Sequence, residues 1–208
     1  VAYWHIVKVI GFGGEGNDTI IMASDVLVPT ELHGGAGNDK LVAGINGASI
    51  LYGDDGNDTL CANVNKNDGS VFCNTVTPTG ANGITMYGGS GNDSMYGGAG
   101  GDTMYGSSGD DNLFGNGGND ILIGGAGNDA LAGGSNNDTY IFTTFGGDDT
   151  VTEAAGAPAG TNDILDFSAA IGYLNGSVDS TGIHLTGWGY TVNSTSSSLE
   201  FEQILGSR

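Results

Sequence analysis

One nine-residue pattern, Gly-Gly-x-Gly-x-Asp-x-apolar-x, recurs nine times in this chain, and six of the copies follow one another without a gap. The unbroken copies begin at Gly88, Gly97, Gly106, Gly115, Gly124 and Gly133, and three earlier copies begin at Gly13, Gly34 and Gly53. A fixed period this short predicts a solenoid, in which a repeat cannot bury its apolar face until neighbouring repeats stack on it. The repeat therefore constrains the fold more than any other feature of the sequence.

Each repeat divides into a turn and a strand. Glycines in the first six positions allow left-handed backbone conformations and a close approach of the chain to an ion. The last three positions alternate outward, inward and outward, as in a strand with one buried face. The inward residue is the eighth of each repeat, as in Leu60, Met95, Met104, Leu113, Leu122, Leu131 and Tyr140. We expect an all-β fold, a right-handed parallel β-solenoid, or β-roll.

Two repeats make one turn of such a solenoid, so alternate repeats stack their aspartates on the same side. This predicts one column of Asp18, Asp39, Asp58, Asp93, Asp111 and Asp129, and a second column of Asp102, Asp120 and Asp138. Carboxylates on strands about 4.8 Å apart repel by about 1 kcal/mol in water and about 3.5 kcal/mol at an effective dielectric constant of about 20. Calcium, whose bonds to oxygen are about 2.3–2.6 Å long, spans that gap and also binds exposed glycine carbonyls. The sequence therefore predicts calcium between successive turns, with less regular spacing near the N-terminus.

Composition supports a cation as the partner. The chain has 208 residues, with 24 acidic and 4 basic side chains and a formal net charge of −20. Nucleic acid is excluded as a partner because neutralising phosphates requires clusters of Lys and Arg. Roughly seven calcium ions, one per stacked pair, would offset most of the charge. Without calcium, an acidic disordered chain becomes the expected state. No stretch is apolar enough to span a membrane, and no secretory signal is visible at Val1.

Five regions follow from the pattern. They are an N-terminal cap strand at residues 1–12, irregular turns of the roll at 13–61, an insertion loop at 62–87, the regular roll at 88–141 and an irregular β-rich C-terminal cap at 142–208. Weak echoes of the motif precede Asp149 and Asp163, and longer strands are predicted at 139–144, 149–153, 163–167 and 183–191. The last segment, 199–206, is similar to 6–11, which favours a module cut from a longer array or a protomer that stacks end to end. Cys61 and Cys73 flank part of the insertion and form either a disulfide or two free thiols.

Segments such as GGSGNDSMY, GGAGGDTMY and GGAGNDALA resemble the repeats of the RTX family of exported bacterial proteins, over about two-thirds of the chain. The resemblance implies that the second and fourth carbonyls and the aspartate of one repeat bind calcium. The first and third carbonyls and the aspartate of the next same-side repeat then complete the site. It also implies type I secretion, with folding outside the cell, where calcium is abundant, and a location that is extracellular or at the bacterial surface.

The residues implied here are Gly14, Gly16 and Asp18 with Gly34, Ala36 and Asp39; Gly35, Gly37 and Asp39 with Gly53, Asp55 and Asp58; Gly89, Gly91 and Asp93 with Gly106, Ser108 and Asp111; Gly98, Gly100 and Asp102 with Gly115, Gly117 and Asp120; Ser107, Gly109 and Asp111 with Gly124, Ala126 and Asp129; and Asn116, Gly118 and Asp120 with Gly133, Ser135 and Asp138. Ser107, Asn116 and Asn136 replace glycine in these turns, which should strain the backbone slightly while leaving the carbonyls available.

The favoured function is a calcium-dependent structural module of a surface layer, an extracellular filament or an adhesin, with other copies or neighbouring modules as partners. An enzyme is not expected, because His5, His33 and His184 are scattered and no Gly-x-Ser-x-Gly elbow occurs. Two alternatives stay open. One is a non-catalytic accessory or secretion module of an exported enzyme, and the other is a sugar- or ice-binding module that could use Trp188 and Tyr190.

Overall fold

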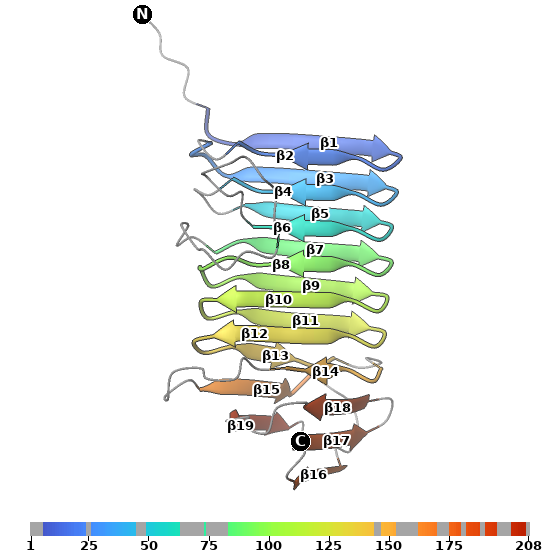
Figure 1. Cartoon of the computed structure of the whole chain (residues 1–208), viewed down its shortest axis with the longest axis vertical. Helices are drawn as coiled ribbons and strands as arrows, with labels where there is room; N and C mark the ends of the chain where they lie inside the picture. The colour runs from blue at the N-terminus through green and yellow to red at the C-terminus, as the bar shows by residue number, and fades with distance from the viewer. Residues whose placement is uncertain are drawn as a thin grey trace, which may run out of the picture.

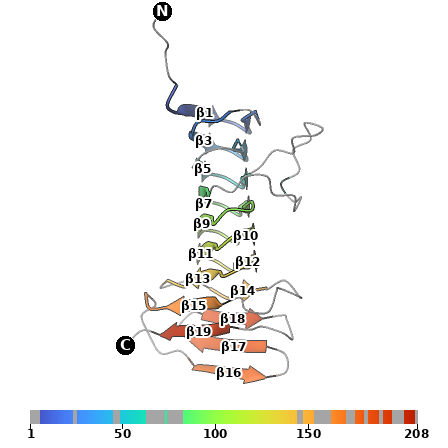
Figure 2. The same ribbon diagram turned by 90° about the vertical axis from the view of Figure 1, so that its left-hand side faces the viewer.

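The chain forms two long β-sheets that face each other along one axis (Figures 1 and 2). A computed structural model describes residues 6–23, 26–44, 49–62, 73, 83–143, 147–152 and 162–169 with their side chains. It also describes the backbone of residues 175–179, 182–187, 190–194 and 201–206. None of these residues is helical. The described part of the chain accordingly has no long apolar helix that could cross a membrane.

The nine strands of the first sheet are, in spatial order, β1 (Val9–Glu15), β3 (Thr30–Ala36), β5 (Ile50–Asp55), β7 (Thr85–Ser90), β9 (Thr103–Ser108), β11 (Ile121–Ala126), β13 (Thr139–Ile141), β15 (Asp163–Phe167) and β19 (Phe201–Gly206). The ten strands of the second sheet, read from the same end, are β2 (Thr19–Ile21), β4 (Lys40–Val42), β6 (Thr59–Cys61), β8 (Ser94–Tyr96), β10 (Asn112–Gly117), β12 (Ala130–Ser135), β14 (Thr150–Val151), β18 (Tyr190–Ser194), β17 (Gly182–Gly187) and β16 (Asn175–Asp179).

Pairing within each sheet is parallel from the N-terminal end onward, and the chain crosses from one sheet to the other after nearly every strand. Each coil of chain therefore contributes one strand to each sheet. The predicted all-β parallel β-roll is confirmed.

The core is one continuous row of inward side chains between the two sheets. All seven predicted inward residues are buried, with at most 1% of their surface exposed; they are Leu60, Met95, Met104, Leu113, Leu122, Leu131 and Tyr140. The register of the parallel strands places equivalent residues of successive coils beside each other, as Met86 beside Met104. Because burying one such side chain stabilises the fold by about 1.5–3 kcal/mol, the row contributes to holding the coils together whether or not an ion is bound.

A ladder of aromatic rings runs along the outer surface of the first sheet. Phe12, His33, Tyr52, Tyr87 and Tyr105 stack in that order, with neighbouring ring centroids 4.5–5.0 Å apart. On the second sheet, Tyr96 and Phe114 stack in the same way, at 5.1 Å. Each ring faces the ring of the next coil, because a parallel in-register sheet repeats each outward position at the strand spacing.

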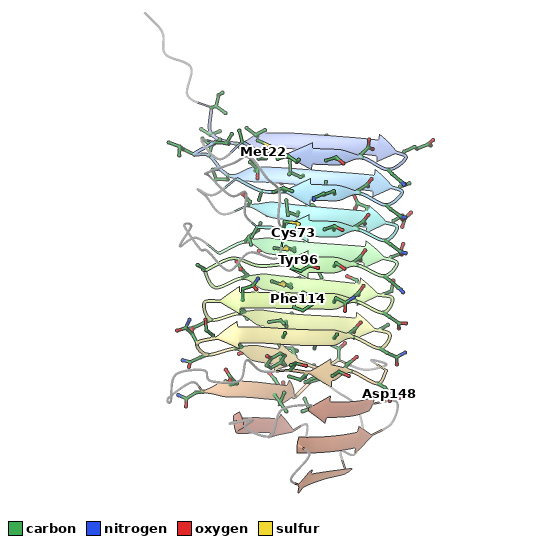
Figure 3. All side chains as sticks on the ribbon, viewed as in Figure 1. Met22, Cys73, Tyr96, Phe114 and Asp148 are labelled. Carbon is green, nitrogen blue, oxygen red and sulfur yellow. A yellow bond between two sulfur atoms is a disulfide. The ribbon has the colours of Figure 1, made fainter. Side chains whose placement is uncertain are left out.

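The two cysteines form a disulfide, which settles the alternative that the sequence left open. Cys61 lies on β6 with its side chain buried on the outside of the second sheet, and Cys73 and Tyr96 pack against it together with Val42. Figure 3 shows Cys73, Tyr96 and Phe114 along this sheet. The disulfide therefore ties Cys73 to the face of the second sheet opposite the core.

The parallel ladders continue past residue 141, the last residue of the predicted regular roll. β14 pairs with β12, β15 pairs with β13, and β19 pairs with β15, all in parallel. Phe142, Val151, Leu165 and Phe167 extend the core into these coils.

The second sheet turns antiparallel at its C-terminal end, where β17 pairs with both β16 and β18. The single strand predicted over 183–191 is wrong, since Gly187 pairs with Tyr190 across a hairpin. At this end of the roll, the antiparallel hairpin closes the second sheet.

Candidate metal columns

Aspartates of successive coils are joined by hydrogen bonds into two columns. In the first column, each backbone N–H donates to Oδ1 of the next aspartate at 2.7–3.0 Å; the members are Asp18, Asp39, Asp58, Asp93, Asp111, Asp129 and Asp149. In the second column, the same bond joins Asp102, Asp120, Asp138 and Asp163 at 2.7–2.8 Å. The structure thus brings the predicted aspartates together in the predicted order.

The second carboxylate oxygen, Oδ2, is the unusual feature of these columns. It is buried and has no hydrogen-bond partner in Asp18, Asp39, Asp58, Asp93, Asp111, Asp120 and Asp129. Native structures rarely leave a buried polar atom without a partner, because the loss of its hydration costs free energy that nothing repays. A repeated orphan oxygen therefore marks a position where each coil lacks a cation or a donor.

The first glycine of each motif makes room for this oxygen. A Cβ added to Gly106 would clash with Oδ2 of Asp111 and with the carbonyl oxygen of Gly124 in the next coil. The same two partners, the motif's own aspartate and the next carbonyl, surround Gly34, Gly53 and Gly115. Oδ2 and a carbonyl of the neighbouring coil therefore converge on one small space, as calcium coordination requires.

The second and fourth residues of the motif turns adopt the left-handed backbone region. These positions are occupied by Gly14 and Gly16, Gly35 and Gly37, Asp54 and Gly56, Gly89 and Gly91, Ser107 and Gly109, Asn116 and Gly118, Gly125 and Gly127, and Gly134 and Asn136. The expected strain at Ser107, Asn116 and Asn136 falls here, with φ values of 85°, 72° and 79°. Left-handed residues cost roughly 1–2 kcal/mol each when they are not glycine, so these turns are held in place by their neighbours.

Carbonyls at the third position keep one coil fixed on the next. The fourth-position N–H of one coil donates to the third-position oxygen of the coil that follows, as from Gly16 to Ala36, Gly37 to Asp55, Gly91 to Ser108 and Gly109 to Ala126, at 2.7–2.9 Å. Ser135 lies at the same place in β12, paired with Gly117. Since a carbonyl oxygen has two lone pairs, each of these predicted ligands keeps one for a cation.

Burial disfavours the charged form of these aspartates. It raises the pKa of Asp93 and of Asp120 to about 7, and the pKa of Asp58 and of Asp111 to about 6, with neighbouring carboxylates as a lesser cause. Burial likewise raises the pKa of Asp149 to about 7. Ionising these buried carboxylates without a bound cation thus costs free energy, and a cation would remove that cost.

One predicted half-site is built differently. Neither Gly98 nor Gly100 has a positive φ, and Oδ2 of Asp102 accepts a hydrogen bond from the N–H of Gly98 at 2.7 Å. The carbonyl of Gly98 accepts a further bond from the N–H of Gly117 at 3.1 Å. The turn from Gly97 to Asp102 therefore has no orphan oxygen.

The site predicted from the sequence omitted two sets of residues. Asp149 and Asp163 extend the columns by one aspartate each, and the only sequence signal was the weak echo of the motif before each of them. The second set is a ladder of the residues that precede the aspartates: Asn17, Asn38, Asn57, Asn92, Asp110, Asn128 and Asp148. In this ladder the N–H of each residue donates to Oδ1 of its counterpart one coil earlier, which is the reverse of the aspartate bonds. Asp148, labelled at the edge of the roll in Figure 3, ends the series as the donor to Asn128.

Two carboxylates at most come together at each of these places. Among the described residues, no cluster of three or more His, Cys, Asp or Glu side chains could hold a metal ion. Any ion in the columns must take the rest of its ligands from backbone carbonyls, which favours a hard cation that prefers oxygen.

A family model supports the same conclusion from the sequence side. The RTX calcium-binding nonapeptide repeat matches in four copies, over residues 11–21, 33–64, 80–113 and 105–140. The chain belongs to this RTX repeat family. A comparison with curated proteins found no match. RTX repeats bind calcium, so the two columns belong to a calcium-binding module of β-roll type.

Proposed function

We propose that calcium bridges successive coils of this RTX roll. Each ion would take an aspartate and the second and fourth carbonyls from one coil, and an aspartate and the first and third carbonyls from the next same-side coil. The observation that carries the proposal is the buried, unpartnered Oδ2 that recurs in the columns. The coils that fit this description are those joined by the first-column aspartates from Asp18 to Asp129, the pair Asp58 and Asp93 included, and by Asp120 and Asp138.

The role we propose is that of a structural module in an exported bacterial surface protein. A net charge of −20 and orphan carboxylates disfavour the compact state when calcium is scarce. An abundant supply of calcium outside the cell would relieve both and complete the fold. The disulfide between Cys61 and Cys73 supports export, because disulfides persist in oxidising compartments. Type I secretion is the route that this behaviour would suit.

Assembly through the N-terminal end of the roll is part of the proposal. The first strand, β1, has no partner on its outer edge among the described residues. Ile10 and Phe12 on β1 are 52% and 72% exposed, whereas Ile121, which takes the place of Ile10 in a later coil, is 37% exposed. An open parallel edge of this kind is a template for another strand, from a second copy or from a neighbouring module.

A sugar-binding role is less well supported. Sugars stack on the faces of aromatic rings, and the rings from Phe12 to Tyr105 already face one another along the roll. Trp188 lies outside the described residues. An accessory role in an exported enzyme would use the same calcium columns, and only the remainder of the host protein would separate it from a surface role.

Calcium titration of the chelator-treated chain, followed by circular dichroism and light scattering, tests the proposal. At a temperature above the melting point of the metal-free chain, calcium addition should give a cooperative rise in β-structure, and scattering that grows only afterwards would support assembly. The matched variants are Asp111→Asn in the column and Asp110→Asn on the exposed ladder beside it. An identical calcium response in wild type and Asp111→Asn would refute the bridging role of the column.

A further inference from the structure

The turn from Gly97 to Asp102 departs from the other motif turns although its sequence, GGAGGD, keeps the motif glycines and the aspartate. Its fifth residue is Gly101, where the other copies carry Asn or Asp. In the eight other motif turns, the second and fourth residues both have positive φ. Neither Gly98 nor Gly100 does. The parallel pairing of β8 with β10 also stops at Tyr96, so this turn lies outside the ladder that its counterparts belong to.

Both carboxylate oxygens of Asp102 have donors. Oδ1 accepts the N–H of Ile84 at 2.8 Å, and Oδ2 accepts the N–H of Gly98 at 2.7 Å. In Asp111, by contrast, Oδ1 accepts the N–H of Asp93 and Oδ2 has no partner. The atom that would face an ion in Asp111 therefore closes the backbone of its own turn in Asp102.

On its N-terminal side, this turn stacks on the end of a coil that carries no motif. That coil ends in Gly83 and Ile84, which do not belong to a motif, and it is tied to the turn by a bond from the N–H of Thr103 to the carbonyl of Ile84 at 2.9 Å. Gly83 lies so close to the carbonyl of Gly101 that a Cβ there would clash with it. The position of Asp102 at the start of its column does not explain the unusual turn, because Asp18 also begins a column and its turn has the ordinary geometry.

We propose that Asp102 is a turn-closing residue and not a calcium ligand, so that the second column binds its first ion between Asp120 and Asp138. This inference rests on the proposed function, since it assigns which aspartates of the columns hold calcium. The family pattern would place an ion between Asp102 and Asp120. In the structure, both carboxylate oxygens of Asp102 accept hydrogen bonds, and Gly98 and Gly100 lack the left-handed backbone that the second and fourth residues have in the other motif turns.

Counting bound ions tests this directly. Wild type, Asp102→Asn and Asp111→Asn are dialysed to equilibrium against excess calcium, and calcium per chain is measured by atomic emission. Asp102→Asn should bind as many ions as wild type, whereas Asp111→Asn should bind fewer. Loss of an ion in Asp102→Asn would overturn the inference and leave the proposed function intact. Absence of calcium from the wild-type chain would instead refute the proposed function.

A second pair of variants covers the case in which Asp102→Asn does not fold. Gly98 and Gly125 are both second residues of their motifs. A Cβ on Gly98 would meet nothing closer than Cβ of Ala62, at 3.7 Å, whereas a Cβ on Gly125, where φ is +118°, would clash with the carbonyl of Ser107. In calcium, Gly98→Ala should melt at the wild-type temperature and Gly125→Ala below it. Equal losses in both would show that the turn adopts the ordinary ion-binding geometry, which would overturn the inference.

Discussion

Replacing Asp111 by Asn should change stability in opposite directions with and without calcium. The asparagine keeps an Oδ1 that can accept the N–H of Asp93, which donates to Asp111 at 2.8 Å. It exchanges the orphan Oδ2 for an amide that can donate to nearby carbonyls. The substitution therefore removes a calcium ligand and a buried charge while it preserves the contact between coils.

The two effects have different magnitudes. Burial raises the pKa of Asp111 from 3.8 to about 6, so ionising it in the bare column costs up to about 3 kcal/mol above neutral pH, less whatever solvent at the turn screens. Without calcium, Asp111→Asn should be more stable than wild type by at most that amount. In the proposed scheme, Asp111 serves two ions, shared with Asp93 and Asp129. At free calcium 100-fold above the dissociation constant, each ion contributes about 2.7 kcal/mol, so the stabilisation by calcium should shrink by about 5 kcal/mol.

Thermal melting followed by circular dichroism, once in chelator and once in calcium, measures both effects at about pH 8. Asp110→Asn is the matched control, because Asp110 is exposed and accepts the N–H of Asn128 in a ladder that has asparagine at most other coils. The control should respond to calcium as wild type does. The reasoning is refuted if Asp111→Asn is less stable than wild type in chelator, or if its calcium response equals that of Asp110→Asn.

Three further predictions concern the bare columns, the glycine cradle and the core. Burial raises the pKa values of Asp93 and Asp120 to about 7, so the folded metal-free chain binds more protons than the unfolded chain. Its melting temperature in chelator should therefore decrease as the pH is raised from about 5 to about 8. An increase over that range would contradict the assignment. Gly115→Ala, whose Cβ would clash with Oδ2 of Asp120, should weaken the calcium response in a titration, while Gly117→Ala, whose nearest neighbour atom would be 3.3 Å away, should not. Leu122→Ala should lower unfolding free energy by about 2–5 kcal/mol in urea, with or without calcium, because the residue is fully buried; a loss seen only in calcium would contradict the independent role of the core.

The roll and both columns could be predicted from the sequence because the nonapeptide leaves little geometric choice. Once a glycine-rich turn and a three-residue strand repeat every nine residues, the inward position of Leu113 and the stacking of Asp93 on Asp111 follow. The asparagine ladder carried a signal nearly as regular, Asn or Asp before every motif aspartate except Asp102, which follows Gly101. It escaped notice because its partners are backbone N–H groups of the next coil and not each other.

What could not be predicted depends on contacts between segments of irregular length. The Asp102 turn keeps the glycines and the aspartate of the motif, and Gly101 in place of Asn or Asp is its departure in sequence. Its packing against Gly83 and Ile84 shows how the turn differs in structure. Asp149 and Asp163 join the columns across sequence separations of 20 and 25 residues, so neither keeps the spacing of the regular repeats. Loops of variable length can return a chain to the same column, and a search for a fixed period does not find them.

The claim on which the account depends is that calcium sits beside Oδ2 of the stacked aspartates and joins one coil to the next. Anomalous scattering from crystals grown in calcium tests it most directly. The account predicts a row of anomalous peaks along the first column, each between two successive aspartates, and a second row that begins between Asp120 and Asp138. Well-ordered coils with no peak beside those oxygens would contradict it.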